Sequence, residues 1–169
     1  MVAEIVIGNS SDFTVYFGDG VQGAVDTYGV YIKPESIKGY FMTPAAIKSI
    51  LSLDNISIIQ LGAQNVIYRM KGIIIDTFAE FENFKKALTY WAGGNSGATY
   101  GGKLLTFQAK DVNGNEWSKI AVYSTPGTLE TITVKIIQNV EFEPLPSGKF
   151  MIKNLEVIRA KPFEEAADE

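Results

Sequence analysis

The sequence contains no cysteine and no histidine among its 169 residues. Without cysteine, the chain can form no disulfide and has no thiolate nucleophile. The sequence therefore does not indicate whether its compartment is oxidising or reducing. Without either residue, it cannot build a Cys/His zinc site or a Ser-His-Asp triad. Carboxylate chemistry, binding and assembly are the functions left to consider.

Positive charge and long apolar runs are also scarce. Fifteen Lys and Arg face 19 Asp and Glu, and the resulting net charge of −4 argues against phosphate-driven binding to nucleic acid or to anionic membranes. The longest apolar runs, such as residues 73–75, are far below the roughly 20 residues that a bilayer span requires. The N-terminal segment carries Glu4 and lacks the basic start of a signal peptide. We expect no specific nucleic acid and no membrane as partners.

The rest of the composition is typical of a folded protein, with 46% hydrophobic and 12% aromatic residues. A chain of this length buries roughly 70% of its unfolded surface, so it needs no disulfide or metal for stability. No linker or shift in composition divides it, which predicts a single domain over residues 1–169. Four of the last seven residues are acidic, which predicts a flexible, solvated tail at about 163–169.

Alternation of side chains is the main pattern along the chain. It predicts strands at residues 66–75, 130–138 and 150–159, because successive side chains of a strand point to opposite faces. Further strands are predicted at residues 3–7, 13–17, 28–32, 37–41 and 56–61. The pair Asn113-Gly114 predicts a hairpin between residues 104–111 and 115–123, with positive φ at both turn residues.

One principal helix is predicted at about residues 77–92. Thr77 and Glu80 form a capping box at its start. Side chains at three- and four-residue steps form an inward stripe, which consists of Phe78, Phe81, Lys85 through its stem, Leu88 and Trp91.

A shorter helix is predicted to begin at Thr43-Pro44, with Ile47, Ile50 and Leu51 facing inward. One long helix among many strands favours a mainly β fold, a mostly antiparallel β-sandwich or barrel with the helix packed across one face or end.

Two glycine- or asparagine-rich segments resemble ligand loops but lack required residues. Residues 97–103 have the glycine and Gly-Lys spacing of a phosphate loop, yet Leu104 follows where a hydroxyl must hold magnesium. Residues 111–115 begin like a calcium loop, yet Glu116 and Val122 stand where that loop needs glycine and glutamate. We predict no metal ion and no cofactor.

The carboxylates offer one candidate pair for catalysis. Glu141 and Glu143 flank Phe142 and fall on the same strand face. A hydrolase needs two carboxylates in unequal surroundings, and nothing in this segment indicates such a difference. The pattern favours a polar outer face beside a buried Phe142, so we predict no catalytic residue and no enzymatic activity.

The segment after the helix, residues 93–102, contains five glycines. Such a loop often becomes ordered only on contact, and aromatic residues beside it supply contact area at little entropic cost. We therefore predict an interface that comprises Gly93, Gly94, Asn95, Ser96, Gly97, Tyr100, Gly101, Gly102 and Trp117. The aromatic residues Tyr90, Trp91, Tyr100, Trp117 and Tyr123 are also candidates for a sugar-binding platform.

The order of elements from residue 66 onward is similar to that of a known family. Residues 68–72 lead into a strand, and the capped helix, the glycine-rich loop, the hairpin at Asn113-Gly114 and a final strand pair joined at residues 141–149 follow. This order resembles the β-sandwich domain of the tail tube and distal-tail (baseplate) proteins of long-tailed bacteriophages. Residues 1–61 match no part of that pattern.

The resemblance implies a helix packed against a sandwich and subunits whose sheets join in rings around a channel. It implies a non-enzymatic structural protein of a virus-like tail (tube, distal tail or baseplate) that forms a homo-oligomeric ring such as a hexamer. The partners would be further copies and other tail proteins, and the location would be the virion tail, assembled in the host cytoplasm. The alternative is a carbohydrate- or protein-binding β-sandwich module.

Overall fold

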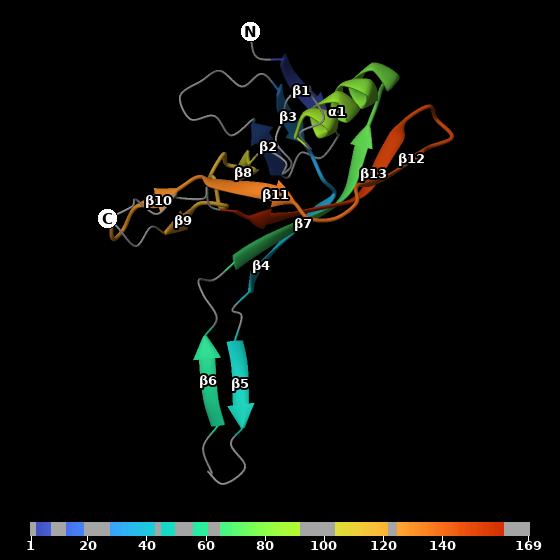
Figure 1. Ribbon diagram of the computed structural model, residues 1–169. Coiled ribbons are helices and arrows are strands. Elements are labelled where there is room, and N and C mark those ends of the chain that lie inside the picture. Colours follow the sequence, from blue (N-terminus) through green and yellow to red (C-terminus); the bar gives the residue numbers. More distant parts are fainter. Residues whose placement is uncertain are drawn as a thin grey trace, which may run out of the picture.

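The computed structural model contains a large curved sheet and, among the residues that it describes, one helix (Figure 1). The structure describes residues 3–7, 13–18, 28–42, 45–49, 56–60, 65–91, 104–121 and 125–160. In chain order the elements are β1 (Ala3–Ile7), β2 (Phe13–Gly18), β3 (Tyr28–Ile32), β4 (Ser36–Met42), β5 (Ala45–Ser49), β6 (Ile56–Gln60), β7 (Asn65–Ile75), α1 (Phe78–Trp91), β8 (Leu105–Asp111), β9 (Ile120–Ala121), β10 (Leu129–Glu130), β11 (Ile132–Ile136), β12 (Glu141–Pro144) and β13 (Phe150–Arg159).

The large sheet has nine strands in the order β1-β3-β2-β8-β11-β13-β7-β4, and β12 pairs with β13 beside this path. Only β1 and β3 pair in parallel among the described ladders. The predicted fold class, mainly antiparallel β with one principal helix, is confirmed. The acidic tail at about 163–169 lies outside the described residues.

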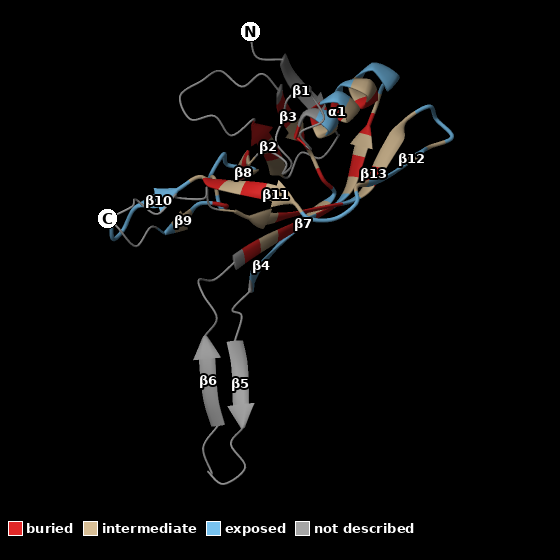
Figure 2. Ribbon diagram, in the orientation of Figure 1, coloured by how far each residue is buried: buried red, intermediate tan, exposed pale blue. Residues whose placement is uncertain are grey.

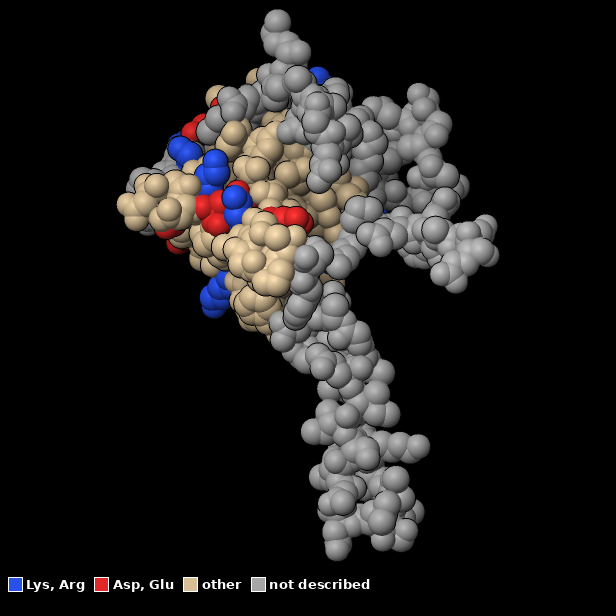
Figure 3. Space-filling view, turned by 90° about the vertical axis from the view of Figure 1, so that its left-hand side faces the viewer, with Lys and Arg blue, Asp and Glu red and all other residues tan. Residues whose placement is uncertain are grey.

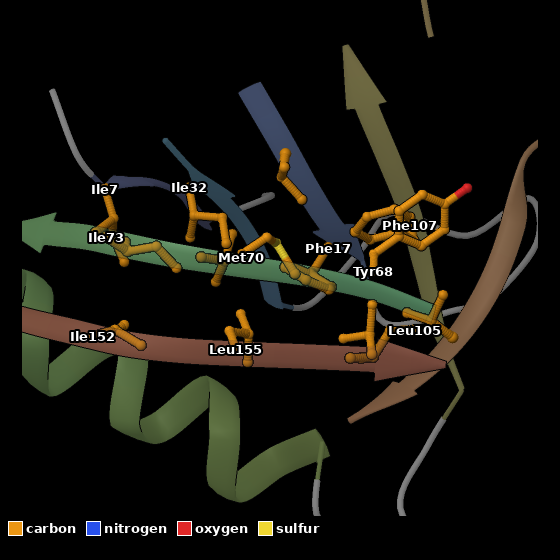
Figure 4. Packing of buried hydrophobic residues seen from close by; sticks show 14 of the residues in the cluster. Ile7, Phe17, Ile32, Tyr68, Met70, Ile73, Leu105, Phe107, Ile152 and Leu155 are labelled. Atoms are coloured by element: carbon orange, nitrogen blue, oxygen red, sulfur yellow. The ribbon is translucent and has the colours of Figure 1, made fainter. Parts of the chain in front are cut away.

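The sheet curls on itself and encloses the core. Strands β1 and β7 lie far apart in the strand order but contact each other, and α1 packs against β1, β3 and β7. Figure 2 shows buried residues along β2, β7, β11 and β13. Figure 4 shows how side chains from different strands meet there, with Tyr68 beside Phe107 and with Ile7 and Ile32 near Ile73.

Helix α1 begins and ends within one residue of the predicted bounds. The Thr77 hydroxyl oxygen accepts a hydrogen bond from the Glu80 N–H at 3.2 Å, as the predicted cap requires. The buried face of α1 differs from the predicted stripe, because Phe84 and Ala87 are buried whereas Phe78 is 62% exposed. Phe81 and Trp91 are in the core and Leu88 is partly buried against it, so part of the stripe is confirmed.

Strict alternation fails in the middle of β7. Val66, Tyr68 and Met70 are buried, and the next buried residues are Ile73 and Ile75, so the inward face changes parity. The change occurs at Gly72, which has a φ of +68°. The register with β13 is the same before and after Gly72, so no residue is inserted, and the left-handed conformation, which glycine adopts at little cost, changes which side chains point inward.

The predicted hairpin after β8 is wrong over most of its length. Strand β8 also pairs with β2 and β11, so the returning chain pairs with it only near the turn, through the bridge between Lys110 and Glu116 and the two backbone bonds beside it, and β9 pairs with β10 instead. Gly114 has a φ of +80°, whereas no described non-glycine residue, Asn113 included, has a positive φ. The turn therefore has one left-handed residue, not the predicted two.

Residues 45–49 do not form the predicted short helix. They form β5, which pairs with β6 from Ala45 opposite Gln60 to Ser49 opposite Ile56. Pairing with a distant segment has outweighed the local helical spacing, since strand formation depends on partners that a sequence window does not contain. Figure 1 shows this ladder beyond the ends of β4 and β7, pointing away from the large sheet.

Candidate assembly surface

Strand β4 is an edge of the large sheet. It pairs with β7 along its whole length, from Ser36 opposite Lys71 to Met42 opposite Asn65. No other strand pairs with β4 in the part of the chain that the structure describes. Its outward backbone N–H and C=O groups can therefore accept a further strand.

Two adjacent aromatic residues stand on opposite faces of this edge. Tyr40 is 41% exposed and Phe41 is 72% exposed. The guanidinium of Arg69 lies 5.1 Å from the centroid of the Tyr40 ring, so Tyr40 is partly covered on the outer face. Phe41 lies opposite the buried Val66, so it belongs to the inner face but projects past the core. The strand thus exposes a large apolar side chain at an open edge.

Trp117, a predicted interface residue, lies close to β4. Its ring is 41% exposed and meets the Tyr68 ring edge-on, with 5.6 Å between the centroids. A Cβ atom at Gly39 would lie 3.1 Å from Tyr68 and 3.7 Å from Trp117, so the missing side chain lets both rings approach β4. Trp117 therefore joins the inner face of the open edge.

Tyr68 anchors this group of rings in the core. Its ring lies 4.8 Å from that of Phe107, and its hydroxyl donates to the Ser118 carbonyl oxygen at 3.4 Å. Burial raises the pKa of the Tyr68 hydroxyl, an effect that the charge of Arg159 opposes. The Ser118 hydroxyl oxygen also accepts a bond from the Ala109 N–H at 2.9 Å. The position of Trp117 is thus fixed by neighbours in β7 and β8.

Three charged residues form a row across the outer face. Lys38 lies opposite Arg69 in the β4–β7 ladder, and Arg69 lies opposite Glu156 in the β7–β13 ladder. Arg69 Nε donates to Glu156 Oε2 at 3.0 Å, and Glu156 is only 7% exposed. The buried carboxylate is thus paired, as burial of a charge requires. A pocket of about 280 Å³ opens beside the pair, and Lys71, Gln138 and Asn154 also line it.

The second edge near this row is β12. Lys153 forms ion pairs with Glu141 at 3.3 Å and with Glu143 at 3.0 Å, and hydrogen bonds to Glu143 and Glu141 raise the pKa of Lys153. The two glutamates thus share one outer face. Phe142 is 46% exposed, so the prediction of a buried Phe142 is wrong. Its ring reaches Phe81 edge-on at 5.1 Å, and the ring of Phe81 takes the deeper position against the stacked Phe150.

The residues that resemble a calcium loop have a structural explanation. Both Asp111 carboxylate oxygens accept hydrogen bonds from the turn itself, from the N–H groups of Asn113 and Asn115 and from the Asn115 side-chain amide. The bonds from Asn115 lower the pKa of Asp111. Within the described residues no three acidic side chains form a group able to hold a metal ion.

The other predicted interface residues, Gly93 to Gly97, Tyr100, Gly101 and Gly102, lie outside the described residues, so the structure brings only Trp117 to the β4 edge. Lys38, Tyr40 and Phe41 also belong to this edge but were not among the predicted interface residues. Their signal was present: an adjacent Tyr-Phe pair in a predicted strand puts an aromatic ring on each face. Recognising it requires knowing that the strand is an edge.

Neither the surface charge nor the length of the helix points to a nucleic acid or a membrane as a partner. On the described part of the face in Figure 3, acidic and basic side chains lie intermingled rather than in separate fields. Among described residues, no helix has the length and apolar character needed to cross a membrane. No protein-family model matches the chain, and no curated protein sequence matches it.

Proposed function

We propose that this protein is a non-enzymatic structural component of a virus-like tail, in the tube, the distal tail or the baseplate. It assembles into homo-oligomeric rings through sheet edges and loops, and it contacts other tail proteins in the virion. The single observation that carries the proposal is the open edge of β4, with Phe41 72% exposed beside it. The element order described from the sequence supports the choice of a tail component.

Covering the β4 edge with another protein surface is energetically more favourable than leaving it exposed to water. Covering a phenylalanine ring contributes roughly 1.5–3 kcal/mol, and a strand added at the edge gains main-chain hydrogen bonds as well. Trp117 and Tyr40 extend the apolar area on either side of the strand. A neighbouring subunit that pairs along β4 covers all three side chains at once.

Replacing Phe41 by Lys tests this function directly. Wild-type protein is expected to reach masses that are multiples of 18.5 kDa in light scattering and to form rings in negative-stain micrographs. Phe41→Lys is expected to weaken assembly at least roughly tenfold, because it places a charge at the centre of the contact. Val112→Lys is the matched control, since Val112 is 67% exposed and lies in the turn after β8. Equal behaviour of both variants, or a wild type that stays monomeric, contradicts the proposal.

The half-exposed Trp117 favours one second candidate, a carbohydrate- or protein-binding β-sandwich module. A sugar ring could stack on the exposed part of this residue, near Gly39. The only other tryptophan, Trp91, is 3% exposed, so a Trp91→Phe variant reports on Trp117 alone. A saturable change in the fluorescence of this variant with glycans, in a protein that remains monomeric, would favour the module over the tail component.

A further inference from the structure

Strands β12, β13, β7 and β4 form a four-stranded antiparallel part of the sheet, with β12 at one edge and β4 at the other. One row of residues crosses all four strands, from Glu141 through Asn154 and Lys71 to Ser36. Each strand runs antiparallel to its neighbour, so β12 and β4 run in opposite directions. A second copy displaced sideways without large rotation would therefore bring its β12 antiparallel to β4.

The outer faces of the two edges carry opposite net charge. At β4, the cations Lys38, Arg69 and Lys71 outnumber the single carboxylate of Glu156 on the outer face, so the balance there is positive. Lys38 has no ion pair with any described residue. At β12 the two carboxylates of Glu141 and Glu143 share one cation, which leaves a net charge of −1. Opposite charges on adjacent strands stabilise pairing.

The inner faces match at the same time. Phe142 lies opposite the buried Ile152, and Phe41 lies opposite the buried Val66, so each phenylalanine is on the core side of its edge strand. Both rings are substantially exposed in a single copy. In the antiparallel register that sets Glu143 opposite Lys38, Phe142 falls opposite Gly39 and lies diagonal to Phe41 on the inner face, while carboxylate meets ammonium on the outer face.

We infer that the partner of the β4 edge is β12 of a second copy of this chain, in a head-to-tail contact selected by Lys38 and Glu143. This inference rests on the proposed function, because it names the partner at the same edge. Pro144 cannot donate to a ladder, so backbone pairing is confined to Glu141–Glu143 and the side chains provide the selectivity. A contact between two β4 strands is disfavoured, since it brings the cations of both copies together. Head-to-tail contacts close into rings or extend as filaments.

Charge reversal tests the pairing. Lys38→Glu and Glu143→Lys are each expected to weaken assembly roughly tenfold, because each puts like charges across the contact. The double variant Lys38→Glu/Glu143→Lys is expected to assemble within about threefold of wild type, since the swap restores an opposite pair. Lys86→Glu, an exposed change on α1, is the control for net charge. Circular dichroism confirms that each variant is folded before its mass is measured by light scattering.

The outcomes separate the two proposals. A wild type that stays at 18.5 kDa overturns both the proposed function and this contact. A wild type that assembles, with single variants that assemble equally well or a folded double variant that stays weak, overturns only the pairing of Lys38 with Glu143. An assembly that stops at two copies overturns the head-to-tail arrangement.

Discussion

Strands β4 and β12 are both edges of one sheet, yet the chain supports them differently. The four-residue β12 ends at Pro144, its two glutamates are bound by Lys153, and Phe142 leans on the core residue Phe81. The seven-residue β4 contains no proline, and Phe41 beside its open side is largely exposed. Short strands, charges and proline limit pairing at an edge, and β12 has all three, so it offers only the three residues before Pro144 for backbone pairing. The contrast favours β4 as the longer of the two proposed contact strands.

The largest expected effect concerns the support of β12. Phe81→Ala removes a buried ring that stacks on Phe150 at 4.0 Å, so it should lower the free energy of unfolding by about 3–5 kcal/mol. Phe78→Ala is the matched control, because that ring is mostly exposed and its loss should cost less than about 1 kcal/mol. Urea unfolding followed by circular dichroism gives both values. Equal losses of unfolding free energy in the two variants would show that the buried face of α1 is assigned wrongly.

A smaller effect is expected where the chain enters β4. The Glu35 N–H donates to the carbonyl oxygens of Lys71 at 2.9 Å and Gly72 at 3.3 Å, and a Cβ on Gly72 would lie 2.8 Å from that of Glu35. Gly72→Ala should therefore destabilise by about 2–3 kcal/mol, through positive φ and the close contact together. Gly114→Ala has a similar φ and open space, so it should cost only about 1 kcal/mol. Thermal unfolding of the two variants isolates the contact with Glu35, and equal losses would argue against it.

The smallest effect concerns the ion pairs of β12. The raised pKa of Lys153 means that the folded state binds its proton more tightly than the unfolded state, whose ordinary value is 10.5. The stabilisation is therefore fully present below about pH 10.5 and is lost as pH rises through the higher pKa of the folded state. The melting temperatures of wild type and Lys153→Gln should differ slightly at pH 8 and converge in strong alkali. A difference that stays constant across this range would show that the ion pairs contribute nothing.

Local features of the sequence predicted local features of the fold. Thr77 and Glu80 cap the helix because both partners lie within one turn, and alternation located most strands within one or two residues of their bounds. The parity change at Gly72 was missed because alternation assumes a uniform backbone. The segment after Gly114 was paired wrongly because the neighbours of β8 come from residues 13–18 and 132–136, far away in the chain.

Predicting the candidate assembly surface requires more knowledge of contacts between distant parts of the chain than predicting the strands does. Trp117 was predicted from its residue type, but its place beside Gly39 and Tyr68 follows from the order β13-β7-β4 and from the bonds of Ser118. Phe41 and Phe142 look alike in a sequence window, as aromatic residues inside short strands. Only the sheet order shows that each lies on an edge.

The position of β7 has a consequence for synthesis on the ribosome. One side of β7 pairs with β4, which precedes it, but the other side pairs with β13, whose Phe150 lies 150 − 75 = 75 residues after its partner Ile75. At roughly 5–20 residues per second, β7 waits about 4–15 s before its second neighbour emerges. During that interval one side of β7, which is later paired with β13, has no partner, so the solubility of the nascent chain depends on the rate of translation or on chaperones that bind the unpaired side.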